Sequence, residues 1–335
     1  MNTHQISQLI SNSKFDSVLV VVEKYVFVNL DWLTNRDYQS QGINELIFSV
    51  GQYTDHTFVF LIRDGVNCRL TGLSAVVETI IKNLDLAHDT CYIYGYDDLR
   101  IPNSTFVELD AIQMWCHNIN QIINVPMSTP FCGKKFAGLF GRHDLYRFKF
   151  FRHLYDNYRQ DSILSYNSTK ATWNYRFAET YFDDDRQWYE KNCPVLLDFE
   201  KASGWVPFQD SLANISKHYH TYFVEIVCET DIYSNRFFTE KTLKNFHLGK
   251  PFLLFSGPGS LEYLKARGFL TFEPYINEHY DTVKCPYTRH QAIINEIDRL
   301  AQLSIFELQN MLHQLTPIFE HNRIRFRNLL LGRNL

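Results

Sequence analysis

The sequence lacks any apolar run long enough to cross a membrane. Its longest apolar runs, such as residues 18–22, have the length of a strand, whereas a membrane-spanning helix needs about 20 apolar residues. Residues 1–5 also lack the basic start and the apolar stretch of a signal peptide. We therefore expect a protein without a membrane span that stays in the cytoplasm, or in the host cytoplasm if a virus encodes it.

The sequence also lacks features that would indicate nucleic-acid binding, a redox-active cysteine pair or a zinc site. The formal net charge is −4, so there is no overall positive field to hold a nucleic-acid backbone, although a local basic channel is compatible with it. The seven cysteines form no CxxC pair, and we interpret them as reduced, mostly buried thiols. The histidines show no HxH or HExxH spacing with a carboxylate, so the sequence predicts no zinc site.

Strand and helix patterns alternate along the chain, which is typical of α/β proteins, and two domains are expected from 335 residues. In the first part the patterns predict strands at residues 18–22, 25–30, 45–50, 57–62, 91–94 and 122–125, and helices at 73–86 and 106–118. Pro126 and Pro130 cannot continue a strand or a helix, so they mark a linker. The predicted domains are residues 1–130 and 131–315, with a last helix at 316–335 that packs back at their interface.

The alternation continues after the linker. Strands are expected at residues 136–140, 222–228 and 251–255, and helices at 145–155, 239–248, 260–267, 288–314 and 316–331. Gly268 follows the third of these helices, where a glycine cap is common. Residues 157–220 give the weakest pattern, and we expect loops and short helices there.

The helix expected at residues 239–248 begins with residues that suit an anion site. Thr239 is a suitable N-cap, which places Glu240 and Lys241 in the first turn. The positive end of a helix and its free amide groups attract phosphate. A carboxylate there accepts hydrogen bonds from ribose hydroxyls, and an ammonium group pairs with phosphate. The alternative is that Glu240 only stabilises the helix dipole and that Lys241 is a solvated surface charge.

A second anion site is predicted at the helix that begins near residue 145. This helix follows a strand and a Gly-Arg turn that contains Arg142, and it carries Arg147 in its first turn. The forked guanidinium group of arginine binds two phosphate oxygens at once. In the alternative interpretation, Arg147 pairs with Asp144 or with another surface carboxylate.

The order of motifs in the second part resembles the nucleotide-binding half of the α-1,3-fucosyltransferase family. The residues that carry this resemblance are Glu229, 238–241, Asn245, 249–252 and 257–259. Residues 268–272 and 277–281 are also similar to short viral and bacterial glycosyltransferase-like proteins. The resemblance covers about residues 133–300. Thr230 stands where the family has asparagine, and the loop at 231–237 differs, so the sugar is not defined.

The resemblance implies a GT-B architecture, in which two Rossmann-like α/β domains face each other across a cleft. It implies that Glu240 binds the ribose of a nucleoside-diphosphate sugar and that Lys241 and Arg147 bind its diphosphate. Glu229 is expected close to the donor sugar, as a candidate catalytic residue. The other candidate donor contacts are Arg142, Tyr233, Thr239, Gly257 and Glu278. For Glu278, a contact to the sugar or to the acceptor is left open.

We therefore expect sugar transfer from a nucleoside-diphosphate sugar to a hydroxyl group of a glycan or another acceptor, with inversion. An inverting transfer needs a general base, and Asp31 and Asp64 follow strands of the first domain, where that base is expected. Arg147 and Lys241 would offset the charge of the departing diphosphate, so no obligatory metal is expected. The acidic run at residues 183–185 is interpreted as a solvated loop or a helix cap.

Two other functions are left open. One is a phage-type glycosyltransferase that modifies hydroxylated bases in DNA, which the acidic charge balance disfavours. The other is a module that binds a nucleotide sugar or a glycan without turnover, which the combination of Arg147, Glu240 and Lys241 disfavours. A resemblance at the level of the fold identifies neither the sugar nor the acceptor.

Overall fold

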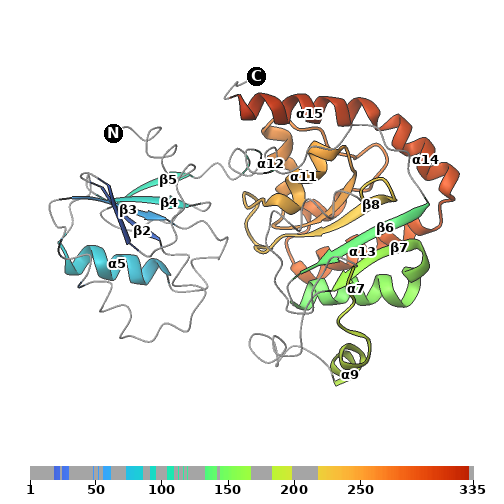
Figure 1. Ribbon diagram of the computed structural model, residues 1–335, viewed down its shortest axis with the longest axis horizontal. Coiled ribbons are helices and arrows are strands. Elements are labelled where there is room, and N and C mark those ends of the chain that lie inside the picture. The colour runs from blue at the N-terminus through green and yellow to red at the C-terminus, as the bar shows by residue number, and fades with distance from the viewer. Residues whose placement is uncertain are drawn as a thin grey trace. The chain divides into compact units, whose positions relative to one another are not determined.

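The computed structural model divides the chain into two compact units, Met1–Met114 and Trp115–Leu335 (Figure 1). Before residue 120 it describes residues 19–22, 25–29, 56–61, 73–85, 91–95 and 104–108 and the single residues 48, 52, 112, 116 and 119. Beyond that point it describes residues 133–141, 144–166, 183–197 and 218–331. The predicted linker at residues 126–130 and the strand expected at 122–125 lie outside these residues.

The first unit contains one sheet with the strand order β1-β2-β3-β4-β5. Its strands are β1 (Leu19–Val22), β2 (Tyr25–Asn29), β3 (Thr57–Leu61), β4 (Cys91–Gly95) and β5 (Thr105–Glu108), and α5 (Leu73–Asn83) connects β3 to β4. The first two strands are antiparallel, and the other neighbours are parallel. Val26 and Val28 on β2 are fully buried, as are Phe58 and Phe60 on β3. Alternate residues of a strand share a face, so these side chains form one packed face of the sheet.

Two sequence predictions for the first unit are wrong. The helix expected at 106–118 starts too early, because residues 105–108 form β5 and pair with β4. Phe106 and Val107 are residue types that favour strands, and the residues described between 109 and 120, which are 112, 116 and 119, are helical. The strand expected at 45–50 also fails, since Phe48 is helical and 75% exposed. Phe48 itself is therefore not part of a buried strand.

The second unit contains a parallel sheet with the strand order β7-β6-β8-β9. The strands are β6 (Lys134–Phe140), β7 (Ser162–Tyr166), β8 (Tyr222–Cys228) and β9 (Phe252–Phe255). Every residue of β8 is buried, which is typical of a central strand in a parallel sheet that has helices on both faces. The α/β class predicted from the sequence is therefore confirmed.

Two predictions for the second unit need correction. The strand β7 lies in the region where only loops and short helices were expected. The same region contains α9 (Asp183–Asn192), which is a helix of the expected kind. Serines at both sides of Ile163 and Leu164 interrupt the apolar pattern of β7, and its burial is supplied by its neighbours in the fold. The single helix expected at 288–314 is two helices, α13 (Pro286–Ala301) and α14 (Ile305–Gln314). Ser304 and Glu307 form a capping box, which starts the second helix anew.

Helices cover both faces of this sheet (Figure 1). On one face are α7 (Leu145–Tyr158) and α13. There the ring centroid of Phe150 lies 4.2 Å from that of His290 and 5.5 Å from that of Phe255. On the other face are α11 (Glu240–Leu248) and α15 (Thr316–Leu330), where Arg323 donates a hydrogen bond to the carbonyl oxygen of His247 at 3.3 Å. Beside β9 the chain forms α12 (Ser260–Ala266), closed by Gly268 with φ +82° as predicted, and η5 (His279–Thr282). None of the helices in the described part of the chain has the length and apolar character needed to span a membrane.

The chain leaves β6 and β8, which are neighbours in the sheet, in opposite directions. From β6 it passes through α7 to β7, and from β8 it passes through α11 to β9 on the other side. We call the carboxyl ends of β6 and β8, with the residues that follow them, the switch point. Open α/β sheets bind their ligands at such a reversal of strand order. The residues after Phe140 and Cys228 therefore define where a site is expected.

Candidate functional site

Two helices begin at the switch point. Because the sheet is parallel, α7 and α11 both direct their N-terminal ends toward the carboxyl edge of the strands that precede them. The first amide groups of a helix have no partner within the helix and carry a partial positive charge. This edge of the sheet therefore favours an anion before any side chain is considered.

The start of α11 is fixed by a carboxylate at the end of β8. Glu229 is 1% exposed, and its Oε1 accepts hydrogen bonds from the amide of Thr239 (3.0 Å) and from Thr242 Oγ1 (2.6 Å). Its Oε2 accepts from Thr239 Oγ1 at 2.7 Å. Thr239 is the N-cap of α11, as the sequence predicts, and its hydroxyl oxygen accepts from the amide of Lys241. Glu229 therefore holds the first turn of α11 against the strand.

The side chain of Lys241 reaches the water-exposed side of this helix start. Its Nζ lies 2.9 Å from Thr239 Oγ1, 3.2 Å from Glu240 Oε1 and 3.7 Å from Glu229 Oε2. The side chain of Lys241 is 30% exposed and that of Glu240 is 20% exposed. Burial raises the pKa of Glu240, but Lys241 and Lys244 outweigh it and the pKa is lowered. Glu240 is therefore ionised at neutral pH, next to an ammonium group that a ligand can approach.

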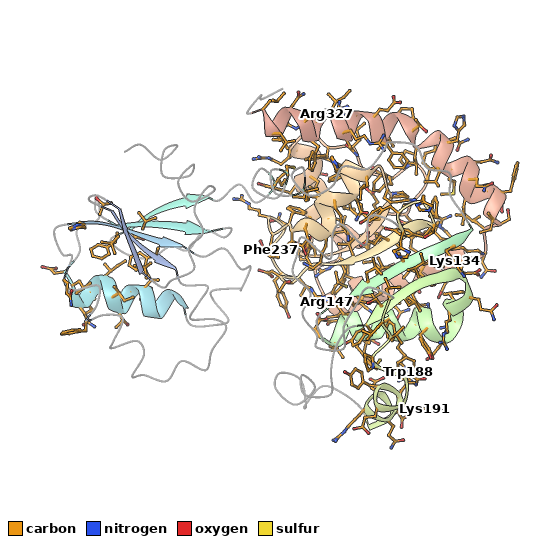
Figure 2. All side chains as sticks on the ribbon, in the orientation of Figure 1. Lys134, Arg147, Trp188, Lys191, Phe237 and Arg327 are labelled. Carbon is orange, nitrogen blue, oxygen red and sulfur yellow. The ribbon has the colours of Figure 1, made fainter. Side chains whose placement is uncertain are left out.

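Arg147, which is labelled in Figure 2, connects the start of α7 to the end of β8 through its hydrogen bonds. Its Nη2 donates to the carbonyl oxygen of Cys228 (3.1 Å) and to Thr230 Oγ1 (3.4 Å), and its Nε pairs with Asp144 Oδ2 at 3.1 Å. The pairing with Asp144, the alternative considered from the sequence, is therefore confirmed. Burial alone would lower the pKa of Arg147, but Asp144 and the groups of β8 raise it, so the charge is kept. Arg147 is only 4% exposed, which makes Lys241 the more accessible cation.

The loop between β8 and α11 is fixed at several points. Asp231 Oδ1 accepts hydrogen bonds from the amides of Tyr233 (2.8 Å) and Ser234 (3.2 Å). Arg289 of α13 donates from Nη2 to the carbonyl oxygen of Ile232 at 2.7 Å. The amide of Gly257 donates to the carbonyl oxygen of Ser234 at 3.2 Å. These bonds hold the loop against the turn that follows β9 and against α13.

Gly257 is needed for this close approach of two backbones. A Cβ added to it would lie 2.3 Å from both the carbonyl carbon and the oxygen of Ser234. Backbone atoms cannot give way as a flexible side chain can, so only glycine fits without moving the loop. The structure thus explains Gly257 by the packing of the loop rather than by an open space for a ligand.

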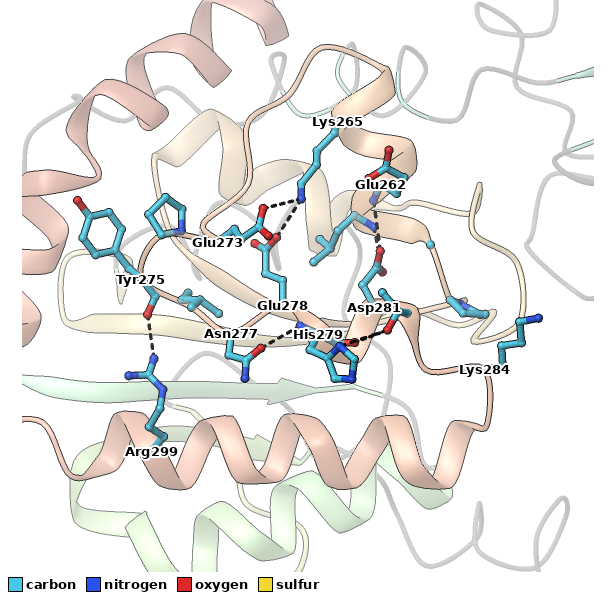
Figure 3. Close-up of a pocket in the computed structure, with 16 residues that line it drawn as sticks. Glu262, Lys265, Glu273, Tyr275, Asn277, Glu278, His279, Asp281, Lys284 and Arg299 are labelled. Carbon is cyan, nitrogen blue, oxygen red and sulfur yellow. Dashed lines mark hydrogen bonds and ion pairs between the residues drawn. The ribbon is translucent and has the colours of Figure 1, made fainter.

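Glu278 lines a separate hollow of about 1120 Å³ beside β9 (Figure 3). Its carboxylate accepts from Thr271 Oγ1 and from the amide of Phe272, both at 2.7 Å, and lies 3.6 Å from Lys265 Nζ. Burial raises the pKa of Glu278. Asp281, on another wall, accepts from the first amides of α12. Lys265, the central cation drawn in Figure 3, is already paired with Glu273 at 3.1 Å and with Glu278 at 3.6 Å, so we place the ligand site at the switch point, where a partly exposed cation meets the start of a helix.

The acidic run at residues 183–185 forms the first turn of α9. Asp185 forms an ion pair with Arg152 of α7, and Asp184 is exposed. No group of three or more histidine, cysteine, aspartate or glutamate side chains in the described ranges is arranged to hold a metal ion. The run therefore lies within a helix rather than in a loop, and the expectation of a solvated run is wrong for Asp185, which is buried against Arg152.

The structure brings together five of the residues that the sequence singled out. Arg147, Glu229, Thr239, Glu240 and Lys241 meet at the switch point, and Tyr233 and Gly257 belong to the adjoining loop and turn. Glu278 lines the other hollow. Arg142, Asp31 and Asp64 lie outside the described residues.

Three supporting residues were missed from the sequence. Thr242 could have been found, because it lies three residues after Thr239 and thus on the same side of the helix. Asp231 could also have been found, because an aspartate that caps the next amides is a common turn signal. Arg289 has no local signal, since its partner Ile232 is far away in the sequence.

Comparison with known proteins found no protein-family model, no curated protein and no solved structure that matches this chain. The switch point and its side chains therefore carry the functional proposal by themselves.

Proposed function

We propose that this protein is a GT-B glycosyltransferase whose nucleoside-diphosphate sugar binds at the switch point of the second unit. The observation that carries the proposal is the exposed ammonium group of Lys241 in the first turn of α11, just beyond the carboxyl end of β8. It stands beside the positive N-terminal end of α11 and the ionised carboxylate of Glu240. A diphosphate joined to a ribose matches these three features in charge and in hydrogen bonding.

In this proposal, Lys241 and Glu240 bind different parts of the donor. A phosphate oxygen replaces Glu240 as the partner of Lys241, whose Nζ is 3.2 Å from Glu240 Oε1 before the ligand binds. The carboxylate is then released to accept hydrogen bonds from the ribose hydroxyls. Binding thus exchanges one surface ion pair, which contributes about 0–1 kcal/mol to stability, for stronger charge-assisted contacts.

Arg147 and Glu229 act as positioning residues in this arrangement. Arg147 has little exposed surface and bonds to Cys228 and Thr230, so it fixes the end of β8 and adds positive charge beneath the phosphates. The carboxylate of Glu229 accepts its hydrogen bonds from the start of α11, so it sets the position of Lys241 rather than attacking a substrate. Fixed positive groups of this kind stabilise the charge that develops on a departing diphosphate.

The acceptor is a hydroxyl group of a glycan or of another hydroxylated molecule, and the first unit supplies its binding surface in this proposal. Asp31 and Asp64 are the candidates for the base that removes the hydroxyl proton, with inversion at the sugar. Lys241, Arg147 and the helix starts offset the charge of the leaving group, so we expect transfer without an obligatory divalent metal.

A thermal-shift panel of nucleoside diphosphates and their sugars tests the donor site. The panel is run on the wild type, on Lys241→Met and on Lys191→Met, a control that removes an exposed lysine from the last turn of α9. A ligand at one hundred times its Kd adds about 2.7 kcal/mol of stability, which is readily measured. We expect one diphosphate to stabilise the wild type and the control fully and to stabilise Lys241→Met by at most about half as much, with EDTA and with Mg²⁺ alike.

The outcomes separate the alternatives. If no nucleotide stabilises the wild type, the donor site is wrong and the glycosyltransferase proposal falls with it. If a nucleotide binds but no sugar is transferred to any glycan or hydroxylated acceptor, the protein is a binding module. If transfer occurs only to hydroxylated DNA and retention on DNA weakens with salt, the DNA-modifying function replaces the glycan one.

A further inference from the structure

The loop between β8 and α11 carries three aromatic side chains with different surroundings. Phe237 and Phe238 are 3% and 0% exposed, and they belong to the core. Tyr233 is 56% exposed. Its own amide is bonded to Asp231, and the carbonyl oxygen of the preceding residue is bonded to Arg289. The amide of Ser234 is also bonded to Asp231, so the loop presents the Tyr233 ring to solvent from a backbone that is held before and after it.

Along the chain, Tyr233 lies between two residues that contact the cationic groups of the switch point. At one end of the loop Thr230 is bonded to Arg147 at 3.4 Å, and at the other end Thr239 is bonded to Lys241 at 2.9 Å. Tyr146, next to Arg147 in α7, lies close enough that burial and the neighbouring Tyr233 raise its pKa. The exposed ring thus belongs to the loop whose two ends contact the cations that we propose for the diphosphate.

We infer that Tyr233 is the surface on which the nucleobase of the donor stacks, an inference that rests on the proposed function. Lys241 and the helix amides take the phosphates and Glu240 takes the ribose, which leaves the flat apolar base without a partner. An aromatic ring on a fixed loop gives such a base a large contact at little cost in conformational entropy. Because every base has such a face, this contact sets affinity more than the choice of base.

Isothermal titration calorimetry on the full chain tests this inference with two probes. One is the nucleoside diphosphate that stabilises the wild type most, and the other is inorganic pyrophosphate, which has no base. The variants are Tyr233→Ala and Tyr233→Phe, with Phe306→Ala as a control that removes another exposed aromatic side chain, on α14. Tyr233 is exposed, so we expect every variant to keep the melting temperature of the wild type without ligand.

We expect Tyr233→Ala to weaken the binding of the nucleoside diphosphate by about 10- to 100-fold, the range for the loss of one stacked base. The affinity for pyrophosphate should stay unchanged. Tyr233→Phe and the control should bind both probes as the wild type does. An equal loss of affinity for both probes would instead show that the loop binds the phosphates. A loss of affinity in Tyr233→Phe would show that the tyrosine hydroxyl makes the contact. A loss seen only with the intact nucleotide sugar would assign Tyr233 to the sugar; each of these results overturns stacking on the base.

The proposed function and this inference fail in different ways. If the wild type binds neither probe, both fall together. If the wild type binds the nucleoside diphosphate and Tyr233→Ala binds it equally well, only the stacking role is lost and the donor site stands.

Discussion

Two glutamate–lysine pairs join β8 to α11, and they differ in how far water reaches them. In the middle of the helix, Lys244 Nζ lies 2.8 Å from Glu225 Oε1, and the side chains are 5% and 3% exposed. At the start of the helix, Lys241 Nζ lies 3.7 Å from Glu229 Oε2, and the side chains are 30% and 0% exposed. The same two elements thus carry one closed pair and one open pair.

The closed pair is completed by protein groups alone. Glu225 Oε2 accepts hydrogen bonds from the hydroxyl groups of Tyr219 (3.0 Å) and Tyr222 (3.3 Å). A buried charge cluster of this kind resists change only while all of its members are present. It fixes α11 on the strand and offers nothing to a ligand.

The open pair divides its work differently. Glu229 gives its hydrogen bonds to the start of α11, while the ammonium group of Lys241 faces a partly exposed surface. Structural support and ligand contact are therefore separated along one helix, and the two lysines provide a matched pair for mutation.

The largest effect is expected from Lys244→Met, which breaks the closed pair. Removal of one partner leaves the Glu225 charge buried without its cation, and we expect a loss of about 3–5 kcal/mol in the free energy of unfolding. Urea unfolding followed by circular dichroism measures this loss. The double variant Glu225→Gln with Lys244→Met removes both charges and should recover a large part of it. A loss below about 1 kcal/mol in the single variant would contradict the closed pair.

A smaller effect is expected from Glu229→Gln, at the carboxylate beneath the open pair. An amide group has one acceptor oxygen in place of two and no charge, so the bonds to Thr239 and Thr242 weaken. We expect a loss of about 1–3 kcal/mol by urea unfolding. Glu262→Gln, which alters an exposed glutamate in the first turn of α12, should change stability by less than about 0.5 kcal/mol. Equal losses in the two variants would contradict the special position of Glu229.

The closed cluster should also make the fold sensitive to alkali. Burial and the Glu225 charge raise the pKa of Tyr219 well above 10, so its contribution to stability is present below pH 10 and is lost as the pH rises above it. One such group contributes about 1.4 kcal/mol per pH unit to the slope of stability. Tyr219→Phe should reduce the slope above pH 10 by about this amount, and Tyr287→Phe, at an exposed tyrosine, should leave it unchanged. An unchanged slope in Tyr219→Phe would show that its hydroxyl ionises freely.

The part of this arrangement that depends on neighbours in the sequence was predictable. The strand at 222–228, the N-cap Thr239 and the glycine after α12 were all expected and are all present. Each depends on a short pattern: an apolar run, a hydroxyl before a helix, or a residue that tolerates positive φ. The strand β7 was not predicted, because its serines interrupt the apolar pattern and its burial comes from neighbouring elements of the fold.

The contacts between distant segments were not predictable in the same way. The order of strands that creates the switch point depends on how β8 passes β7 to lie beside β6. The hydrogen bond from Arg289 to the carbonyl oxygen of Ile232 joins α13 to the loop after β8, and no local sequence pattern near either residue predicts it. The motif from Glu229 to Lys241 indicated which residues matter, and only the fold shows that Arg147 meets them through Thr230.

The smallest effect on stability is expected from Lys241→Met, which makes at the open pair the same substitution as Lys244→Met makes at the closed one. Water reaches the Lys241 side chain, and Glu229 keeps three hydrogen bonds without it, so we expect a change of less than about 1 kcal/mol by urea unfolding. Ligand binding should show the reverse order. If Lys241→Met weakens the nucleoside diphosphate at least tenfold, the stabilisation at one hundred times the wild-type Kd falls from about 2.7 to about 1.4 kcal/mol or less. The folded fraction of Lys244→Met should keep the wild-type Kd, and a loss of affinity in both variants would show that the two pairs act as one unit.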